Sequence, residues 1–412
     1  MNKKHVFLLL FCALFFAFQY GMKSAIPNVL NENLQSYFNA NTSQIGFLLS
    51  LSYLAYTIMQ IPTGLIMDRI SAKKIIVLSF ALFSLGLIAL VSSSNYICAA
   101  ISQIILGTTS SFAFILIMKV TNDYFPRERV ALISGLGMAV GGLGPIISNP
   151  LIAHLSLNFQ WQNIIICFGI MGIICATIVS LVIKEKDLIQ PSATNSLCLI
   201  IKDLKAVISD HRYIRISIFS MMVWGACSSF CDAWGVSFIT YTQEITREEA
   251  AFAISFAYTG MLVGSPLSAY LSEIFNSYKK VMLGEAICFV ILLSLVCFAH
   301  LSTIPLLIIL FAMGACAMAQ FLAFPAVLSM CDKKLGATVT GFVNTITMLG
   351  CVVLVWVIGY VLDWSKGSNL AYSATDYRYS MIISLVSVLV GIIVLAFLEI
   401  PPVKFNKDVG KK

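Results

Sequence analysis

Charged residues are scarce in this sequence, and that scarcity excludes most classes of protein. Asp, Glu, Lys and Arg make up 11% of the 412 residues, and hydrophobic residues make up 59%; a soluble domain typically has about 25% and about 45–50%. A soluble chain so poor in charge would lack the polar surface that keeps it in solution. The sequence instead predicts an all-α membrane protein, with about twelve apolar stretches of roughly 20 residues, each long enough to cross ~30 Å of hydrocarbon.

Catalytic and cofactor-binding motifs are also missing. The four histidines form neither a pair nor an H-E-x-x-H motif, no acid dyad occurs, and no Gly-x₄-Gly-Lys-Ser/Thr sequence is present to bind a nucleotide. The twelve cysteines are scattered through the apolar stretches. Cys227 and Cys231 share a helix face, but no histidine or second cysteine pair accompanies them, so we interpret the cysteines as small apolar side chains. We therefore expect no enzyme activity, no bound metal and no cofactor.

The basic residues occupy every second connector between the apolar stretches. The alternate connectors contribute only Arg247, Lys366 and Arg378. Because cationic loops resist translocation, the basic side is predicted to be cytoplasmic, with both termini inside the cell at a bacterial inner membrane. The net charge of +7 then reflects membrane orientation, and we expect no nucleic-acid partner. The basic connectors hold Lys3, Lys4, Arg69, Lys73, Lys74, Arg127, Arg129, the six basic residues of 184–215, Lys279, Lys280, Lys333, Lys334 and the four lysines of 404–412.

A long polar connector divides the chain into two halves of six stretches. The expected domains are an N-terminal bundle at 1–183, a cytoplasmic connector at 184–212 and a C-terminal bundle with a short tail at 213–412. The first stretch lacks a convincing cleavage site and is predicted to be a retained helix, not a signal peptide. The predicted helices span residues 6–31, 44–67, 74–92, 96–123, 129–153, 160–183, 213–241, 248–271, 280–299, 303–329, 337–363 and 378–398.

A charged motif follows the second stretch and recurs six stretches later. In the first half it consists of Gly64, Asp68 and Arg69, followed by the pair Lys73 and Lys74. The second copy also places a small residue four positions before an acid and ends in a lysine pair, as Ala269, Glu273, Lys279 and Lys280. Internal repetition of this kind is typical of transporters whose site lies between two bundles.

This motif resembles the loop motif G-x-x-x-D-R-x-G-x-[RK]-[RK] of the major facilitator superfamily, with Ser71 in place of the second glycine. The resemblance covers essentially the whole chain. It implies twelve transmembrane helices in two pseudo-symmetric six-helix bundles around a central cavity, and transport by alternating access. It assigns a gating role to Asp68 and Arg69, and we extend that role to Gly64, Lys73 and Glu273.

Several shorter segments of the sequence are similar to those of bacterial permeases for organic anions and metabolites. Two family motifs are nevertheless altered. Gln103 stands four residues before Gly107, where many proton-coupled members carry arginine. In the fifth stretch, Ser148 and Asn149 replace the last two glycines of the antiporter pattern. The segments similar to that group are 234–236, 264–267, 341–344 and Lys119 with 122–126.

Two ionisable residues at matching depth in the first and seventh stretches suggest the substrate site. Lys23 lies 17 residues into its stretch, and Asp232 lies 17 residues beyond Arg215, which at ~1.5 Å per residue places both ~25 Å from the cytoplasmic face. Charges at this depth are costly and usually face a cavity or a partner. They could form an ion pair for which the substrate competes, or Lys23 could bind a carboxylate while Asp232 holds an amine or a proton. Alternatively, both reach the periplasmic interface by snorkelling.

Three further titratable residues lie in apolar stretches. Lys119 is predicted ~10 Å inside the cytoplasmic end of its helix, where it could bind an anionic substrate or hold Asp123 or Glu128. Glu285 is expected to form a structural pair near the interface, and His154 to have no special role. Neutral polar residues complete the predicted substrate-binding set of Gln19, Tyr20, Lys23, Lys119, Trp234, Gln320 and Asn344.

The sequence therefore predicts a secondary active transporter for a small anionic or zwitterionic metabolite, of the amino-acid or organic-acid class. Proton-coupled uptake is the first interpretation, with Asp232 as the proton carrier and a monomer in the lipid bilayer as the working unit. The alternative is a proton-driven exporter of a drug or siderophore, which the partial glycine–proline motif of the fifth stretch favours. A sensor built on a carrier fold would normally add a long cytoplasmic domain.

Overall fold

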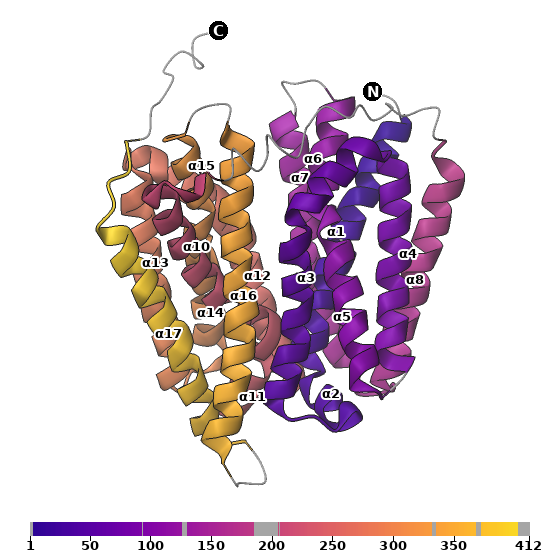
Figure 1. Ribbon diagram of the computed structural model, residues 1–412. Helices are drawn as coiled ribbons and strands as arrows, with labels where there is room; N and C mark the ends of the chain where they lie inside the picture. The colour runs from indigo at the N-terminus through magenta and orange to yellow at the C-terminus, as the bar shows by residue number, and fades with distance from the viewer. Residues whose placement is uncertain are drawn as a thin grey trace.

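The computed structural model describes residues 3–92, 94–125, 130–184, 205, 207–331, 335–367 and 372–402, and within these ranges every regular element is a helix (Figure 1). In the first half the helices are α1 (Lys3–Val29), α2 (Asn31–Phe38), α3 (Thr42–Arg69), α4 (Ala72–Ser92), α5 (Tyr96–Ser110), α6 (Phe112–Tyr124), α7 (Val130–Leu155) and α8 (Trp161–Val182). In the second half they are α10 (His211–Ser228), η3 (Ser229–Trp234), α11 (Gly235–Gln243), α12 (Arg247–Ile274), α13 (Tyr278–Phe298), α14 (Thr303–Ala317), η4 (Met318–Leu322), α15 (Ala323–Leu328), α16 (Gly336–Lys366) and α17 (Ala374–Ala396).

These elements form the predicted membrane-spanning helices. We call each of them, whether a single helix or a run of consecutive helices that crosses the membrane once, a rod. Eleven helical segments in the described ranges are long and apolar enough to cross a membrane, and α3, with 28 residues, runs beside them as a further rod. Three of the rods are interrupted. They are α5 with α6, α10 with η3 and α11, and α14 with η4 and α15. The chain is therefore a multi-pass membrane protein.

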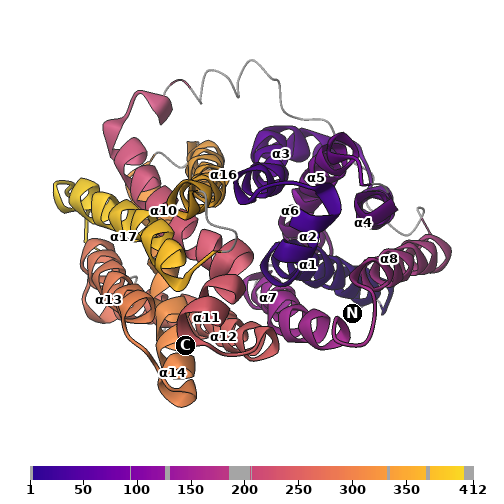
Figure 2. The ribbon, with the colours of Figure 1, turned by 90° about the horizontal axis from the view of Figure 1, so that it is seen from below.

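The rods gather into two bundles, α1–α8 and α10–α17, which lie side by side (Figures 1 and 2). We call the face at which α1 begins and α17 ends the terminal face, and the opposite face, which carries α2, the α2 face (Figure 1). Most of the expected connector at 184–212 lies outside the described residues, and α10 begins at His211.

The same kind of close contact recurs in equivalent rods of the two halves. In the first half, a Cβ atom on Gly107 of α5 would lie 2.1 Å from the carbonyl oxygen of Ser52 in α3. In the second half, a Cβ atom on Gly314 of α14 would lie 1.9 Å from the carbonyl oxygen of Ala257 in α12. Only glycine permits these helix crossings, because small residues let helix backbones approach closely within a membrane. The internal repeat is thus present in the packing as well as in the loop motif.

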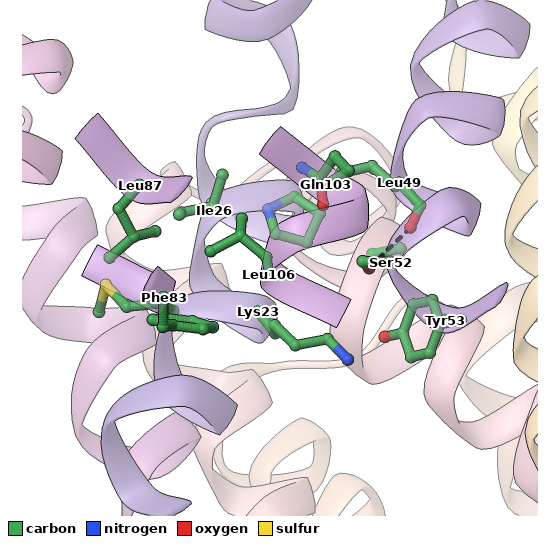
Figure 3. A pocket seen from close by; sticks show the side chains of 12 residues that line it. Lys23, Ile26, Leu49, Ser52, Tyr53, Phe83, Leu87, Gln103 and Leu106 are labelled. Atoms are coloured by element: carbon green, nitrogen blue, oxygen red, sulfur yellow. Dashed lines mark hydrogen bonds between the residues drawn. The ribbon is translucent and has the colours of Figure 1, made fainter. Parts of the chain in front are cut away.

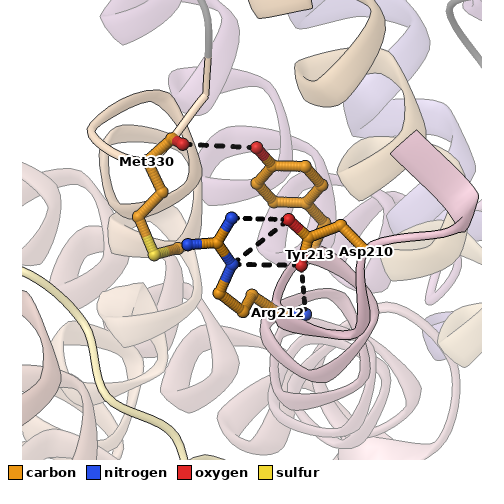
Figure 4. Close-up of polar contacts among 4 residues, drawn as sticks. All are labelled: Asp210, Arg212, Tyr213 and Met330. Atoms are coloured by element: carbon orange, nitrogen blue, oxygen red, sulfur yellow. Dashed lines mark hydrogen bonds and ion pairs between the residues drawn. The ribbon is translucent and has the colours of Figure 1, made fainter. Parts of the chain in front are cut away.

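Several rods begin at side-chain caps that the sequence supplies. At α10, the Asp210 carboxylate accepts from the Arg212 N–H at 2.9 Å and pairs with the Arg212 guanidinium at 2.7 Å (Figure 4). That guanidinium lowers the pKa of the Asp210 carboxyl. Tyr213 then donates to the carbonyl oxygen of Met330 at 3.4 Å, which joins the start of α10 to the chain after α15 (Figure 4). These contacts fix the start of the second half at the terminal face.

Polar contacts between the halves gather at the α2 face. Glu32 of α2 pairs with Arg247 of α12 at 2.5 Å, and Arg247 also donates to the carbonyl oxygen of Val29 at 2.6 Å. His154 of α7 lies 3.1 Å from Glu248 of α12. The two bundles are therefore joined at this face by residues that are far apart in the sequence.

Candidate functional site

Lys23 lies in the interior of α1 and presents its ammonium group to two aromatic rings of α3. The Nζ atom is 4.7 Å from the ring centre of Tyr53 and 5.1 Å from that of Tyr56. A cation over the face of an aromatic ring is attracted by the negative charge density there, by about 0.5–2 kcal/mol depending on desolvation. The lysine is half-buried. Its charge thus lies over two aromatic rings, and no carboxylate of the described residues forms a direct ion pair with it.

A pocket opens beside Lys23 in the first half (Figure 3). In this conformation its enclosed space is about 10 Å³, which is room for about one water molecule. Proline at position 27 has no N–H, so the carbonyl oxygen of Lys23 loses its usual partner within α1. The lining residues are Met22, Lys23, Ile26, Pro27, Leu49, Ser52, Tyr53, Phe83, Leu87, Gln103, Leu106 and Ala233. Most of the lining is apolar, with one cation and a few hydroxyl or amide groups.

Asp232 lies in η3 and is surrounded by hydroxyl donors from three rods. Tyr258 of α12 donates to Oδ1 at 2.5 Å, Tyr53 of α3 donates to Oδ2 at 3.3 Å, and Ser228 of α10 also donates to Oδ2. The side chain is 3% exposed. Buried carboxylates need such donors, because a charge without a partner at membrane depth is costly.

Lys23 and Asp232 are connected through Tyr53. The ring of Tyr53 faces the lysine, and its hydroxyl group donates to the aspartate. Within the described ranges the ion pairs are Lys119–Asp123, His154–Glu248, Arg212–Asp210 and Arg247–Glu32. The direct ion pair that the sequence left open as one possibility is therefore not formed in this conformation.

Asn28 is buried at the junction of the two halves, where its side chain bonds the backbone around the π-helical segment η3. A π-helical turn disturbs the regular ladder of backbone hydrogen bonds, and such turns often occur at functional sites. Asn28 of α1 donates to the carbonyl oxygen of Cys231 at 2.6 Å and accepts from the N–H of Val236 at 2.9 Å. Sequence reasoning missed this role. The signal available was an asparagine next to Pro27 in an apolar stretch.

The altered positions of the fifth stretch also reach the site. Ser148 of α7 donates to the carbonyl oxygen of Gly21 at 2.9 Å, and Asn149 donates to Ser24 at 2.9 Å. Ser24 in turn lies 2.5 Å from the hydroxyl group of Tyr258, a donor to Asp232. Polar side chains thus replace two glycines of the antiporter pattern and join α7 to the Asp232 network.

Comparison with known proteins agrees with this architecture. The sequence profile of the Major Facilitator Superfamily matches residues 9–359 and 240–412. The chain belongs to the major facilitator superfamily. Its fold is similar to the crystal structure of the nucleoside transporter NupG, with a TM-score of 0.76, 13% sequence identity, and coverage of 97% of this chain and 100% of that chain. At that identity the likeness concerns the fold alone.

Curated relatives match more locally. The chain is 25% identical to the hexuronate transporter of Bacillus subtilis (strain 168), over 37% of this chain and 36% of the relative. It is 27% identical to the probable L-galactonate transporter of Escherichia coli (strain K12), over 36% of this chain and 33% of the relative. The matched region thus spans about a third of each of these relatives. Both of these relatives are named as transporters.

The predicted substrate-binding residues fall into two groups in this major facilitator fold. Gln19 and Tyr20 lie one turn from Lys23. Gln19 is 5% exposed and has no hydrogen-bond partner among the described residues, and the Tyr20 ring packs edge-on against Tyr258 at 5.9 Å. Trp234 lies elsewhere. It is fully buried, and its indole N–H donates to the carbonyl oxygen of Val355 in α16 at 3.1 Å. In this conformation Trp234 therefore packs between the halves and does not line the pocket.

The other three residues of the predicted substrate-binding set lie outside the pocket, in the second half or towards the terminal face. Gln320 of η4 accepts from Ser220 at 3.1 Å. Asn344 of α16 donates to Gln60 of α3 at 3.0 Å, a contact between the halves. Lys119 of α6 pairs with Asp123 at 3.3 Å, which is one of the two arrangements that the sequence allowed. None of these three is among the residues that line the pocket.

The predicted gating residues are only partly described. The structure describes the α3 backbone as far as Arg69, but not the surroundings of Gly64 or the side chains of Asp68 and Arg69. Lys73 is half-buried at the start of α4, and Glu273 is exposed near the end of α12. Their gating role stays a prediction.

Glu285 and His154 lie away from the pocket. Glu285 of α13 accepts from Ser268 of α12 at 2.9 Å, a contact within the second half. His154 lies at the end of α7 with an exposed side chain, beside Glu248. The interrupted rod at η3, the lysine on α1 and the hydroxyl groups between them thus form the candidate site.

Proposed function

We propose that this protein is a secondary active transporter that moves a small anionic or zwitterionic metabolite across the inner membrane by alternating access, with uptake driven by protons. One observation carries the proposal. Lys23 is a cation in the interior of a membrane-spanning helix, it lines a pocket, and it forms no direct ion pair with a carboxylate of the described residues, although Asp232 is near enough to interact with its charge. Because such a charge normally requires a counter-charge, we assign that part to the substrate.

The surroundings of Asp232 support separate roles for Asp232 in proton coupling and for Lys23 in substrate binding. Its two oxygens already accept from Tyr258, Tyr53 and Ser228. The carboxylate is therefore stabilised mainly by hydroxyl donors and forms no direct ion pair with Lys23, which leaves the ammonium group available to a substrate anion. A carboxylate at membrane depth is also a natural proton carrier. Asp232 is thus our candidate for coupling, and Tyr53 connects it to the substrate cation.

The relatives favour an organic anion over a drug or siderophore. Hexuronate and L-galactonate, which two of the relatives carry by name, are both carboxylates and match a lysine in the pocket. The exporter alternative depended on the glycine–proline pattern of the fifth stretch. Two of those glycines are Ser148 and Asn149, whose side chains hydrogen-bond α1. The pattern therefore supports export less than a complete motif would.

The distribution of charge supports the proposed orientation. Lys73, Lys279 and Lys280 lie at helix starts on the terminal face, whereas Arg247 and Lys366 lie at the α2 face. Because the basic side stays inside the cell, we assign the terminal face to the cytoplasm and the α2 face to the periplasm. The α2-face contacts would then close the periplasmic side in this conformation and would separate when the carrier opens outward.

Counterflow in proteoliposomes tests the proposal. Vesicles containing the purified protein would be loaded with one unlabelled acid from a panel of amino, sugar and short organic acids, and entry of the labelled acid would be followed. We expect at least one carboxylate to exchange, Lys23→Ala to abolish the exchange, and Lys23→Arg to retain part of it. Lys184→Ala, which removes an exposed lysine just beyond the end of α8 and away from the pocket, is the matched control. Failure of every anion while a lipophilic cation exchanged would favour the exporter.

A further inference from the structure

The side-chain nitrogen of Gln60, on α3, is a buried donor. Its Nε2 atom forms no hydrogen bond with the described residues. The amide oxygen Oε1 accepts from Nδ2 of Asn344 in α16 at 3.0 Å, and this contact fixes which way the amide lies. The Tyr56 hydroxyl group lies near both amides, but its position does not meet the geometry of a hydrogen bond to Gln60 Nε2. Buried donors are nearly always paired, so this one points to a ligand that accepts a hydrogen bond.

Gln60 lies between Lys23 and the terminal face. Tyr56 precedes it by four residues on α3, so the two side chains share one face of the helix. The Nζ atom of Lys23 is 5.1 Å from the centre of the Tyr56 ring. Because α3 runs from the α2 face at Thr42 to the terminal face at Arg69 (Figure 1), Gln60 is about one helical turn closer to the terminal face than that ring.

The contact between α3 and α16 is sealed on one side of Lys23 and partly accessible on the other. Toward the α2 face, Thr42 is 1% exposed and Val355 is fully buried. Toward the terminal face, Tyr56, Gln60 and Asn344 each keep part of their surface exposed. The amide pair is thus a polar contact between the halves on the side of Lys23 that faces the terminal face.

We propose that Gln60 is a second anchoring point for the carboxylate of the transported anion, which it receives from Lys23 as the anion moves toward the terminal face. The inference rests on the proposed function, because Lys23 must hold the anion first. A carboxylate oxygen accepts from Gln60 Nε2. An amide nitrogen carries two donors, and Asn344 uses one of its own on Gln60, so its second donor and the Tyr56 hydroxyl group complete the set.

The chemistry of this cluster suits a step in transit. All three side chains are neutral, and a hydrogen bond from a neutral donor to a carboxylate is weaker than the same contact from a lysine. The anion is therefore bound at Gln60 but not trapped there. A purely structural contact would need no spare donor, whereas the Gln60–Asn344 bond leaves Nε2 free of it.

Exchange measured from each face separately provides the test. Labelled glucuronate, lactate and glutamate would be followed into membrane vesicles that contain the unlabelled acid, with the proton gradient collapsed. In the orientation assigned above, inside-out vesicles present the terminal face and right-side-out vesicles present the α2 face. We expect at least one of the three acids to exchange in the wild type, and Lys23→Ala to abolish that exchange.

Two variants of Gln60 separate binding from structure. Gln60→Leu should lower the apparent affinity at the terminal face about tenfold, as the loss of a hydrogen bond to a charged group allows, and leave the affinity at the α2 face within about twofold. Gln60→Glu keeps an acceptor for Asn344 but replaces the free donor by a negative charge, so it should lower the terminal-face affinity further. Thermal unfolding in detergent would show that both variants are folded.

Gln44→Glu is the matched control. Gln44 lies on the same helix at the α2 face, and its Oε1 atom also accepts one hydrogen bond, from the Asn41 N–H at 2.9 Å. The change therefore keeps an acceptor and adds the same charge away from the amide pair. We expect wild-type affinities at both faces.

The outcomes distinguish this inference from the proposed function. A contact that only holds the halves together would, when lost, raise the affinity at the terminal face and lower it at the α2 face, because the population shifts toward one open state. That result, an equal fall at both faces, or unchanged affinities in both Gln60 variants would overturn the anchoring point, while exchange that depends on Lys23 would leave the transporter proposal standing. If none of the three acids exchanges in the wild type, the anion assignment fails, and the anchoring point fails with it.

Discussion

The side chain of Asn28 in α1 is hydrogen-bonded to the backbone N–H of Val236 in α11, at 2.9 Å and across the two halves of the molecule. The same amide donates to the carbonyl oxygen of Cys231 at 2.6 Å. One side chain of the first half thus bonds two backbone groups in and just after the π-helical segment η3. Asp232 lies within that segment, so the placement of the carboxylate depends on Asn28.

We expect Asn28→Ala to destabilise the protein by about 1–3 kcal/mol, because it removes the side-chain acceptor of the buried Val236 N–H and one of the two donors to the carbonyl oxygen of Cys231. Thermal unfolding in detergent would measure the loss. Asn33→Ala, which changes an exposed asparagine of α2, is the matched control and should unfold as the wild type does. Equal stability of the two variants would show that η3 holds its shape without Asn28.

Tyr53→Phe should separate substrate binding from coupling. The phenyl ring still faces Lys23, but the hydroxyl group that donates to Asp232 is lost. We expect the affinity for the transported anion to change less than about threefold, since the contact that is lost is one hydrogen bond to a different residue. The pH midpoint of uptake should move to higher pH, because a donated hydrogen bond favours the ionised carboxylate. An unchanged midpoint together with a large loss of affinity would reverse these roles.

Asp232→Asn should reduce proton-driven uptake severely and flatten its dependence on pH, while the purified protein stays folded. The amide cannot carry a proton between the two sides of the membrane. Glu285→Gln is the matched control, because Glu285 is also a carboxylate within a membrane-spanning helix but contacts Ser268 away from the pocket. Uptake measured at a series of external pH values should keep its wild-type profile in that control. A flattened profile in Glu285→Gln alone would transfer the coupling role to α13.

Asp363→Ala should weaken the closure of the α2 face. The Asp363 carboxylate of α16 accepts from the backbone N–H groups of Thr42 at 3.2 Å and Ser43 at 2.5 Å, at the start of α3. A carboxylate at a helix N-terminus is stabilised by the helix dipole and the free N–H groups. We therefore expect its loss to shift the population toward the state in which α3 and α16 separate.

Labelling at position 355 would measure that shift. Val355 is fully buried, and Val355→Cys in a cysteine-free background should react with a membrane-impermeant maleimide only when the halves part. We expect several-fold faster labelling with Asp363→Ala, and little change with Glu248→Ala, which removes an exposed contact to His154. Equal rates in the two backgrounds would rule out Asp363 as a closing contact.

Much of the fold followed from the sequence because membrane-spanning helices obey simple rules. Apolar length located the rods, and the loop motif at Gly64 with its second copy identified the superfamily. The interruptions were not predicted. Nothing in the residues Ser229–Trp234 indicates a π-helical turn, because its backbone is satisfied by Asn28, more than 200 positions away.

The candidate site was only partly predictable for the same reason. Depth along a helix placed Lys23 and Asp232 at the same level, but depth does not fix the direction of a side chain. A direct ion pair was one expectation, and in the structure Tyr53 lies between the two residues. Trp234 was expected at the substrate, but its indole ring fills the space between two glycines, Gly46 and Gly359, of opposite halves.

The sequence by itself determined that this chain crosses the membrane many times, because it has too few charged residues to keep a folded chain soluble in water. It also determined the superfamily. Tertiary structure alone decided which polar residues meet. Hydroxyl groups from α3, α10 and α12 converge on Asp232, and Lys23 and Gln103 line one pocket. The physical reason is that a buried polar group must find its partner in space, and in a bundle of helices that partner lies on another rod at a separation that no local pattern records.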